Sequence, residues 1–290
     1  MNASQFIRLI RIPTLAATAV PLIIGGAVGF AQNKFSPLFW VDIFSVALLI
    51  QIGTNVLNEY GDYRRKIDAV PSAGFAGLIL SGEASAREIL ATAVACFVIA
   101  FFLGTILVLF RGLELLILGV LALLVAILYS EGPLPISSTP FGELFVALLM
   151  GPIEVASANL AASGQVSTLS LVFSIPVGFM VAAILLANNL RDLQKDRDHG
   201  RKTLAVIVGM SYGSSILLAL MVLSFIWSVP AFVLFHTSPS IFLVWLAFPV
   251  ALIGYFRITR TDGWARAVPT VSGLHMLVGA LLTLSILIHF

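Results

Sequence analysis

Two polar clusters, each at the end of a long apolar segment, contain the side chains of this sequence best suited to chemistry. In the first cluster Asn58 precedes Asp62 by four residues, and in the second Asn188 precedes Asp192 by the same spacing. Carboxylates at the edge of a membrane are costly unless a cation neutralises them. The clusters are far apart in the sequence, and their likeness predicts one shared site for a divalent metal ion and an anion.

Each cluster presents its polar side chains on one face if the preceding helix continues through it. On the first helix, an arc of about 100° holds Asn55, Asn58, Glu59, Asp62 and Lys66. On the second helix, an arc of about 120° holds Asn188, Asn189, Asp192, Lys195 and Asp196. Asp68 falls off the first arc, and we expect it in the loop that follows.

This set of side chains is typical of Mg²⁺ bound together with phosphate groups. Mg²⁺ prefers oxygen ligands and commonly takes one or two carboxylates plus substrate phosphates. Arg and Lys bind the remaining phosphate oxygens. The sequence lacks the His and Cys spacing of a zinc site and lacks a glycine-rich phosphate loop before a helix. The alternative is a pair of solvated helix ends with ordinary salt bridges.

The elements that must position these clusters are membrane helices. The chain is 59% hydrophobic and 10% charged, whereas soluble domains are about 25% charged. A membrane span needs roughly 20 mostly apolar residues. The sequence therefore predicts an all-α integral membrane protein with about nine transmembrane helices, near 12–31, 38–60, 88–110, 113–130, 141–161, 169–191, 212–235, 239–256 and 269–290. The eighth of these is short, and no cleavable signal peptide is evident.

The basic residues predict how these helices are oriented. With nine spans, one side of the membrane carries all of the 16 lysines and arginines except Lys34 and Arg111. The positive-inside rule then places the N-terminus and both polar clusters in the cytoplasm and the C-terminus outside, with the chain in the plasma membrane. For most of these basic residues, a role in setting the membrane topology alone is a simpler interpretation than a role in the site.

The chain shows no soluble domain, and residues 1–290 are expected to form a single transmembrane domain. The recurring Asn-x-x-x-Asp pattern favours a pseudo-repeat that relates spans one to four with spans five to eight, to which a ninth span is added. The single cysteine, Cys96, lies in the third span, so a disulfide within the chain is excluded.

Two glutamates fall in the fifth predicted span. Glu143 lies near its start and Glu154 within it, and their separation of three helical turns places them on one face. An ionisable side chain inside a membrane indicates a function by default. Glu154 is therefore a candidate proton acceptor, or a group that sets the polarity of the substrate site. The alternative is a buried glutamate that is hydrogen-bonded or protonated. His275, in the ninth span, is interpreted as a packing residue.

The two clusters resemble the paired motifs of the UbiA superfamily of membrane prenyltransferases. Its members carry Asn-Asp-x-x-Asp after the second span and Asp-x-x-x-Asp after the sixth. The corresponding runs are Asn58-Glu59-Tyr60-Gly61-Asp62 and Asp192-Leu193-Gln194-Lys195-Asp196. The run 188–206 is most similar to the branch of 1,4-dihydroxy-2-naphthoate polyprenyltransferases of menaquinone biosynthesis. Further matches at 11–15, 129–135, 142–146 and 274–275 extend the resemblance over almost the whole chain.

The resemblance implies a UbiA-type bundle around a central cavity, and a reaction. In this family Mg²⁺ bridges the acidic motifs and a polyprenyl diphosphate, the allylic C–O bond ionises, and an aromatic ring attacks the carbocation. In the menaquinone branch the ring then loses CO₂ and becomes demethylmenaquinol. The expected partners are a polyprenyl diphosphate, a small aromatic acceptor and the lipid bilayer. Nucleic acid and an obligate protein partner are not expected.

The residues and the resemblance together assign roles to individual positions. Asp62, Asp192 and Asp196 are expected to be catalytic. The expected metal ligands are Asn58, Glu59, Asp62, Asp68, Asp192 and Asp196. The expected substrate-binding residues are Arg11, Asn55, Asn58, Lys66, Tyr129, Glu143, Asn188, Asn189, Arg191, Lys195 and Lys202.

Two departures from the family pattern leave the acceptor open. Glu59 stands where aspartate is usual, and Glu154 stands where this branch is usually apolar. Homogentisate, 4-hydroxybenzoate and a chlorophyllide-like molecule are alternative acceptors. An ion-coupled transporter is an alternative from another class, and kinked spans and Glu154 would suit it. Its ionisable groups would be expected near the membrane midplane, whereas most acids of this chain gather at one face.

Overall fold

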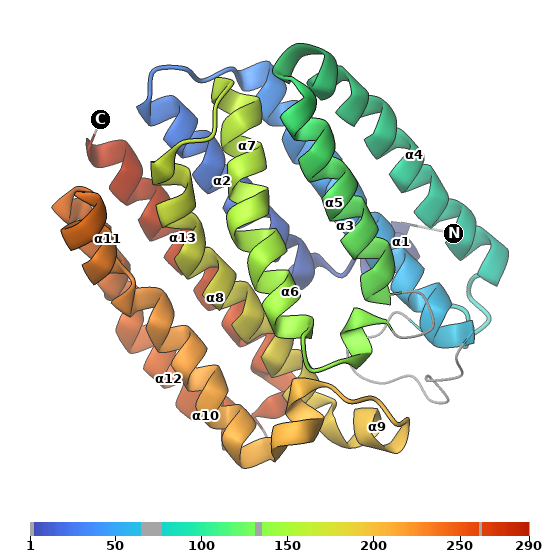
Figure 1. Cartoon of the computed structure of the whole chain (residues 1–290). Coiled ribbons are helices and arrows are strands. Elements are labelled where there is room, and N and C mark those ends of the chain that lie inside the picture. Colours follow the sequence, from blue (N-terminus) through green and yellow to red (C-terminus); the bar gives the residue numbers. More distant parts are fainter. Residues whose placement is uncertain (1–2, 65–76, 131–134, 261–262, 290) are drawn as a thin grey trace.

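The computed structural model describes residues 3–64, 77–130, 135–260 and 263–289, and this part of the chain is a bundle of helices without strands (Figure 1). The elements are α1 (Ala3–Ile10), α2 (Ile12–Ala31), α3 (Pro37–Arg64), α4 (Ala86–Arg111), α5 (Leu113–Ser130), η1 (Ile136–Ser138), α6 (Gly142–Leu148), η2 (Leu149–Ile153), α7 (Glu154–Ser163), α8 (Thr168–Arg191), α9 (Leu193–Asp198), α10 (Leu204–Ile226), α11 (Ser228–Phe235), η3 (Pro239–Ala247), α12 (Phe248–Ile258), η4 (Trp264–Arg266) and α13 (Ala267–His289).

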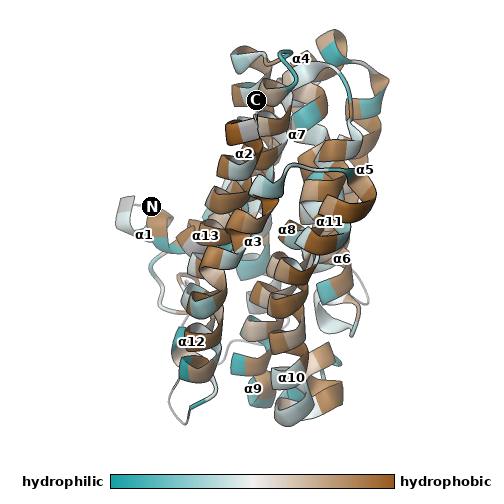
Figure 2. Ribbon diagram, turned by 90° about the vertical axis from the view of Figure 1, so that its left-hand side faces the viewer, coloured by the Kyte–Doolittle hydropathy of each residue, from teal (hydrophilic) through white to brown (hydrophobic). Residues whose placement is uncertain are grey.

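Every one of the nine predicted spans corresponds to a helical segment. Eight segments of the described chain are long and apolar enough to cross a membrane, and the ninth, Leu113–Tyr129 in α5, is shorter. Large apolar side chains on the outer face of α4, such as Phe101 and Leu109, are 65% and 75% exposed. Hydrophobic residues follow the lengths of the helices, and hydrophilic residues gather toward their ends and around α9 (Figure 2). The chain is therefore a multi-pass membrane protein.

The eighth span differs from the prediction that it is short. It begins as the 3₁₀ helix η3 and continues as α12, and together they cover the 20 residues Pro239–Ile258. Because a 3₁₀ helix rises about 2.0 Å per residue and an α-helix about 1.5 Å, this segment extends over roughly 34 Å. The hydrocarbon core is about 30 Å thick, so the segment is long enough to cross it.

The seventh span also differs, because its helix begins earlier than the predicted residue 212. Thr203 caps α10 by accepting a hydrogen bond from the Val206 N–H at 3.4 Å. Gly209 then interrupts the helix with a φ of 76°, a conformation that glycine adopts without steric cost. This interruption, followed by serines at 211, 214 and 215, separates the short apolar run 204–208 from the longer apolar segment, which explains why hydropathy alone places the start too late.

The fifth span contains a π-helical turn between α6 and α7. Pro152 lies in this turn, η2, and cannot donate the backbone hydrogen bond of a regular helix. Gly151 packs against α8 so closely that a Cβ atom would lie 2.9 Å from the Gly178 Cα. Small residues at such a contact allow two membrane helices to approach each other. The turn and the close contact bring α7 against the centre of the bundle.

Three clusters of buried apolar residues form the core of the described chain. The smallest packs α1, α3 and α4 together around Leu9 and Leu78, and the other two border a cavity. The larger joins α2, α8, α10 and α13, with Met180 and Phe225 among its fully buried side chains. The second joins α2, α3, α4, α5 and α7 around Leu22 and Leu107. Residues of both clusters line one cavity, so the predicted central cavity lies between two packed halves of the bundle.

Candidate active site

The C-terminal end of α3 carries the first polar cluster. Asn55 is buried, and its side-chain amide donates hydrogen bonds to the Ile10 carbonyl at 2.9 Å and to the Thr14 Oγ1 at 2.8 Å. Asn55 and Asn58 both line the cavity. Asn55 thus fastens α3 to the junction of α1 and α2, while Asn58 stands on the cavity wall as its spacing predicts.

Glu59 has protein partners for both carboxylate oxygens. Oε1 accepts a hydrogen bond from the Leu78 N–H at 2.8 Å, and Oε2 accepts one from the Gly77 N–H at 3.3 Å. Oε2 also lies 3.9 Å from the Arg11 Nη2. The side chain is only 4% exposed. Glu59 therefore anchors the segment that begins at Gly77 to α3. This structural role was not part of the prediction that Glu59 is a metal ligand.

Arg11 marks the break between α1 and α2. Its backbone is left-handed, with φ 53° and ψ 65°, which is uncommon for a residue other than glycine. Thr14 stabilises the break by donating from its backbone N–H and its hydroxyl to the Arg11 carbonyl, both at 2.8 Å. The Arg11 side chain lines the cavity beside Asn55 and Asn58. A cation therefore stands at the mouth that the two amides form.

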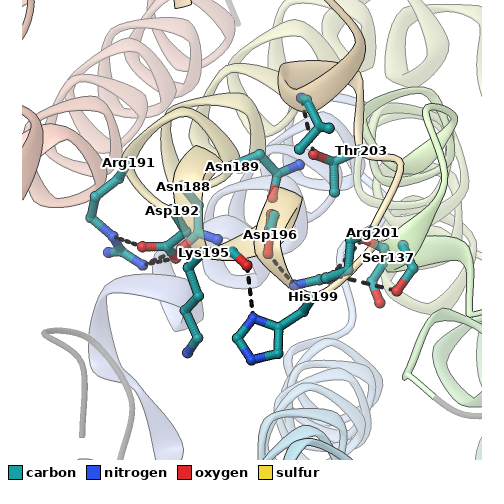
Figure 3. A network of polar contacts seen from close by, with 12 residues as sticks. Ser137, Asn188, Asn189, Arg191, Asp192, Lys195, Asp196, His199, Arg201 and Thr203 are labelled. Carbon is teal, nitrogen blue, oxygen red and sulfur yellow. Dashed lines mark hydrogen bonds and ion pairs between the residues drawn. The ribbon is translucent and has the colours of Figure 1, made fainter. Parts of the chain in front are cut away.

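The second polar cluster closes α8 with a local network (Figure 3). Arg191 donates to both oxygens of Asp192, from Nε to Oδ1 at 2.8 Å and from Nη2 to Oδ2 at 2.6 Å. The same Nη2 donates to the Asn188 Oδ1 at 2.9 Å, and Asn188 lines the cavity. A bidentate contact of this kind holds a carboxylate in one orientation.

Asp196, in the short helix α9, is held by a residue that follows it in the chain. Arg201 donates from Nη1 to the Asp196 Oδ1 and from Nη2 to the Ser137 carbonyl, both at 2.8 Å (Figure 3). Asp196 is 2% exposed, and its Oδ2 has no hydrogen-bond partner in the described part of the chain. Burial raises the pKa of Asp196 above its usual range, and the charge of Arg201 opposes this shift.

Glu143 and Asn189 form a buried pair between α6 and α8. The Asn189 side-chain amide donates to the Glu143 Oε1 at 2.9 Å. The other oxygen of Glu143 is buried without a hydrogen-bond partner among the described residues. Tyr129, at the end of α5, lines the cavity nearby. Asn189 therefore supports the wall behind Asn188, and Glu143 lies outside the cavity lining.

For the remaining predicted site residues, the structure describes less of the side-chain environment. The Asp62 side chain, Lys66 and Asp68 lie outside the described residues. Lys195 is half-buried in α9, where its carbonyl contacts the His199 Nδ1 at 2.8 Å (Figure 3). The Lys202 side chain is exposed, although its backbone N–H donates to the Ser138 carbonyl at 2.9 Å.

Arg201 is the residue that sequence reasoning missed. The basic pattern assigned it to the cytoplasmic side, but not to a contact with Asp196. The available signal was its place five residues after Asp196, in a run that also contains Gly200. Gly200 has a φ of 71°, a turn conformation that glycine favours. The chain reverses there, and the Arg201 N–H donates to the Asp196 carbonyl at 3.0 Å.

One cavity, with a volume of about 320 Å³, joins the two clusters. Its polar end is formed by Arg11, Asn55, Asn58, Tyr129 and Asn188. The opposite end is lined by apolar side chains of α2, α3, α4 and α5, including Leu22, Ile43, Leu107 and Leu115. Asn58 and Ile43 both line the wall, and the length of α3 between them gives the cavity an extent of roughly 22 Å. Such a shape suits a ligand with a charged head and a long apolar tail.

The side chains at the polar end fit Mg²⁺ by their chemistry. Asn58 and Asn188 offer amide oxygens there, and Asp192 and Asp196, which follow Asn188 in the chain, add the carboxylate oxygens that Mg²⁺ prefers. The buried Oδ2 of Asp196 has no hydrogen-bond partner in the described chain. Within residues 3–64, 77–130, 135–260 and 263–289, no group of three or more His, Cys, Asp or Glu side chains is gathered for a metal. A metal here would depend on Asp192 and Asp196, on oxygens of a bound phosphate and on the Asp62 carboxylate.

Comparison with known proteins identifies the family. The sequence profile of the UbiA prenyltransferase family matches residues 18–279. The chain belongs to this family. It is 32% identical to the 1,4-dihydroxy-2-naphthoate octaprenyltransferase of Bacillus subtilis, over 98% of this chain and 92% of that protein. It is 28% identical to the 1,4-dihydroxy-2-naphthoate octaprenyltransferase of Mycobacterium tuberculosis, over 96% and 94% of the two chains.

Solved structures of UbiA proteins share the fold. A UbiA homolog from Archaeoglobus fulgidus, bound to GPP and Mg²⁺, superposes with a TM-score of 0.67 at 17% identity, over 96% of this chain and 99% of that chain. The expected all-α UbiA bundle is thereby confirmed, and this UbiA-family chain is a prenyltransferase.

Proposed function

We propose that this prenyltransferase transfers a polyprenyl group from polyprenyl diphosphate to 1,4-dihydroxy-2-naphthoate in an Mg²⁺-dependent reaction of menaquinone biosynthesis. The observation that carries the proposal is the convergence of Asn58 and Asn188, from the two polar clusters, on the mouth of one long apolar cavity. The acceptor is inferred from the names of the relatives in Bacillus subtilis and Mycobacterium tuberculosis. Homogentisate and 4-hydroxybenzoate are the alternatives that a test must include.

The diphosphate would bind at the mouth, with the tail in the apolar part of the cavity. Asp62, Asp68, Asp192 and Asp196 would hold the metal, together with Asn58. Arg11, Lys66, Arg191, Lys195 and Lys202 would supply positive charge to the diphosphate, and Asn55, Tyr129, Glu143, Asn188 and Asn189 would position it. When bound, Mg²⁺ would neutralise charge on the departing diphosphate.

The reaction breaks the allylic C–O bond, and its electron pair leaves with the diphosphate. The ring carbon that bears the carboxyl group then forms a bond to the allylic carbon. Loss of the carboxyl group as CO₂ returns an electron pair to the ring and gives demethylmenaquinol. The apolar walls around Leu22 and Leu107 exclude water, which would otherwise capture the cation.

The orientation also belongs to this proposal. We infer that the polar clusters and the N-terminus face the cytoplasm of a cell with the chain in its plasma membrane, because the basic residues gather on that side. The C-terminus lies at the end of the bundle opposite α9 (Figure 1). We also infer that residues 1–290 form one transmembrane domain, with spans one to four and five to eight as a pseudo-repeat.

The proposal is tested with the purified protein in detergent, octaprenyl diphosphate, Mg²⁺ and each candidate acceptor. Products are identified by mass spectrometry, and diphosphate release is measured in parallel. Asp62→Asn and Asp192→Asn should each abolish Mg²⁺-dependent release. Asp198→Asn is the matched control, because Asp198 is exposed on α9 and accepts only a hydrogen bond from Gln194 in the described chain. Turnover of another acceptor without any naphthoate product would overturn the assignment.

A further inference from the structure

A band of polar side chains crosses the cavity between its mouth and its apolar end. Thr18 of α2, Gln51 of α3 and Glu154 of α7 line the cavity there, and we call these three residues the polar belt. An ionisable side chain such as Glu154 is costly inside a membrane span and marks a function by default. The site at the mouth does not use any of the three.

The register of α2 and α3 fixes the depth of the belt. Asn55 of α3 donates to the Thr14 Oγ1 of α2 at 2.8 Å, and consecutive spans run in opposite directions. Gln51 and Thr18, each four residues from this pair, therefore lie together about 6 Å farther into the cavity.

The contact of α2 with α7 places Glu154 just beyond this level. The two helices run in the same direction, and a Cβ atom on Gly25 would lie 2.5 Å from the Val155 carbonyl oxygen. The backbone of Glu154 therefore lies about one helical turn farther from the mouth of the cavity than that of Thr18. Helical side chains point toward the N-terminus of their helix, and this direction turns Glu154 back toward Thr18 and Gln51.

Two atoms of the belt have unmet hydrogen-bonding capacity. The Thr18 Oγ1 and the Glu154 Oε2 are buried, and neither has a hydrogen-bond partner in the part of the chain that the structure describes. Ser157, one turn farther along α7, differs because its hydroxyl donates to the Ile153 carbonyl at 2.7 Å. Because an unpaired buried polar atom carries a free-energy cost, these two atoms indicate a ligand group that can form hydrogen bonds.

The backbone before Glu154 supports the same conclusion independently. Glu154 is the first residue after the π-helical turn Leu149–Ile153. Such turns are rare and occur frequently at functional sites, because the extra residue changes which side chains face a cavity. The irregularity in this span therefore immediately precedes its buried carboxyl group.

We propose that the polar belt binds a ring hydroxyl of the aromatic acceptor, and that Glu154 thereby determines which acceptors are used. This inference rests on the proposed function. A hydrocarbon tail offers no hydrogen bond, whereas an acceptor whose reacting carbon lies at the mouth extends its far hydroxyl toward the belt. The Glu154 carboxyl oxygen accepts the hydrogen bond from this hydroxyl, and Thr18 and Gln51 supply the neighbouring polar contacts.

Calorimetric binding under anaerobic conditions tests the proposal, with the full-length protein in detergent and without donor or Mg²⁺. The probes are 1,4-dihydroxy-2-naphthoate and 1-hydroxy-2-naphthoate, which lacks the hydroxyl at C4. The wild type should bind the dihydroxy probe on the order of 10-fold more tightly. Glu154→Leu should bring this ratio close to one and leave the affinity for 1-hydroxy-2-naphthoate unchanged. An unchanged ratio in Glu154→Leu, or a ratio of one in the wild type, overturns the proposal.

Two further variants keep the test decisive. Ser157→Ala, on the same helix and in the same cavity, should preserve the ratio. If Glu154→Leu does not fold, Glu154→Met replaces it, because methionine is similar in length and lacks the carboxyl oxygens, and it should also bring the ratio close to one. Since binding is measured without the donor, a wild type that transfers no prenyl group would reject the proposed function, while the ratio would still decide the subsite.

Discussion

Glu59 and Leu78 are joined by a hydrogen bond of 2.8 Å, from the Leu78 N–H to the Glu59 Oε1. The other carboxylate oxygen accepts from the Gly77 N–H at 3.3 Å and lies 3.9 Å from the Arg11 Nη2. One buried side chain thus connects α3, the segment that leads to α4 and the junction of α1 and α2. Glutamate is one methylene longer than aspartate, and this length allows residue 59 to reach the backbone at 77–78.

We expect Glu59→Asp to lower the free energy of unfolding by about 1–3 kcal/mol, because the shorter carboxylate leaves a buried backbone N–H without a partner. Glu59→Gln keeps the length and one accepting oxygen, so its loss should be smaller. Thermal unfolding in detergent without Mg²⁺ measures both variants. If Glu59 served only as a metal ligand, Glu59→Asp would be as stable as the wild type under these conditions.

The Glu143–Asn189 pair should show strong energetic coupling. Asn189→Leu removes the donor of a 2.9 Å hydrogen bond and leaves a buried carboxyl group unpaired, which should cost about 2–3 kcal/mol of stability. The double variant with Glu143→Leu should lose less than the sum of the single variants, because both partners are then apolar. A double-mutant cycle of unfolding free energies measures this coupling.

The exposed pair of Gln194 and Asp198 is the matched control for this cycle. Its hydrogen bond is 2.8 Å long and joins residues four apart on α9. Exposed pairs of this spacing contribute about 0.2–0.5 kcal/mol. A coupling at Glu143–Asn189 as small as this would contradict a structural role for the buried pair.

The parts of the fold that depend on local composition were predictable from sequence. Hydropathy located all nine spans, and the helical period placed Asn58 and Asn188 on cavity-facing sides of α3 and α8. The convergence of both clusters on one cavity followed from the paired motifs and from the four spans that separate them, because an even number of crossings returns the chain to the same side of the membrane. These features depend on residues close together in the sequence, where periodicity and charge bias are informative.

The parts that depend on tertiary contacts were not predictable. The contact of Glu59 with Leu78 requires the chain to return beside α3, and the contact of Arg201 with Asp196 requires the reversal at Gly200. The 3₁₀ start of the eighth span and the π turn before Glu154 also left no period in the sequence. Hydropathy reports burial, but it does not report which carboxylate oxygen already has a partner.

Metal removal should abolish turnover. Because phosphate and carboxylate oxygens at the mouth repel one another without a cation, EDTA should stop diphosphate release, and excess Mg²⁺ should restore it. Diphosphate release is measured before chelation, after dialysis and after addition of the ion. Unfolding temperatures before and after dialysis serve as the control, since a chelated protein that has unfolded would not report on the metal. Full turnover by a folded, metal-free protein would contradict the assignment of Asp192 and Asp196.

Gly151 should tolerate no larger side chain, because α6–α7 and α8 touch there through backbone atoms. A Cβ atom would lie 2.9 Å from the Gly178 Cα and 3.0 Å from the Ser174 carbonyl oxygen, and neither backbone can move aside cheaply. Gly151→Ala should therefore lower stability by about 1–3 kcal/mol through overpacking. Gly273→Ala is the control, because a Cβ there meets nothing within 4 Å and alanine favours a helix by about 1 kcal/mol. Thermal unfolding should thus shift in opposite directions for the two variants, and equal shifts would show that the close contact does not constrain the π turn before Glu154.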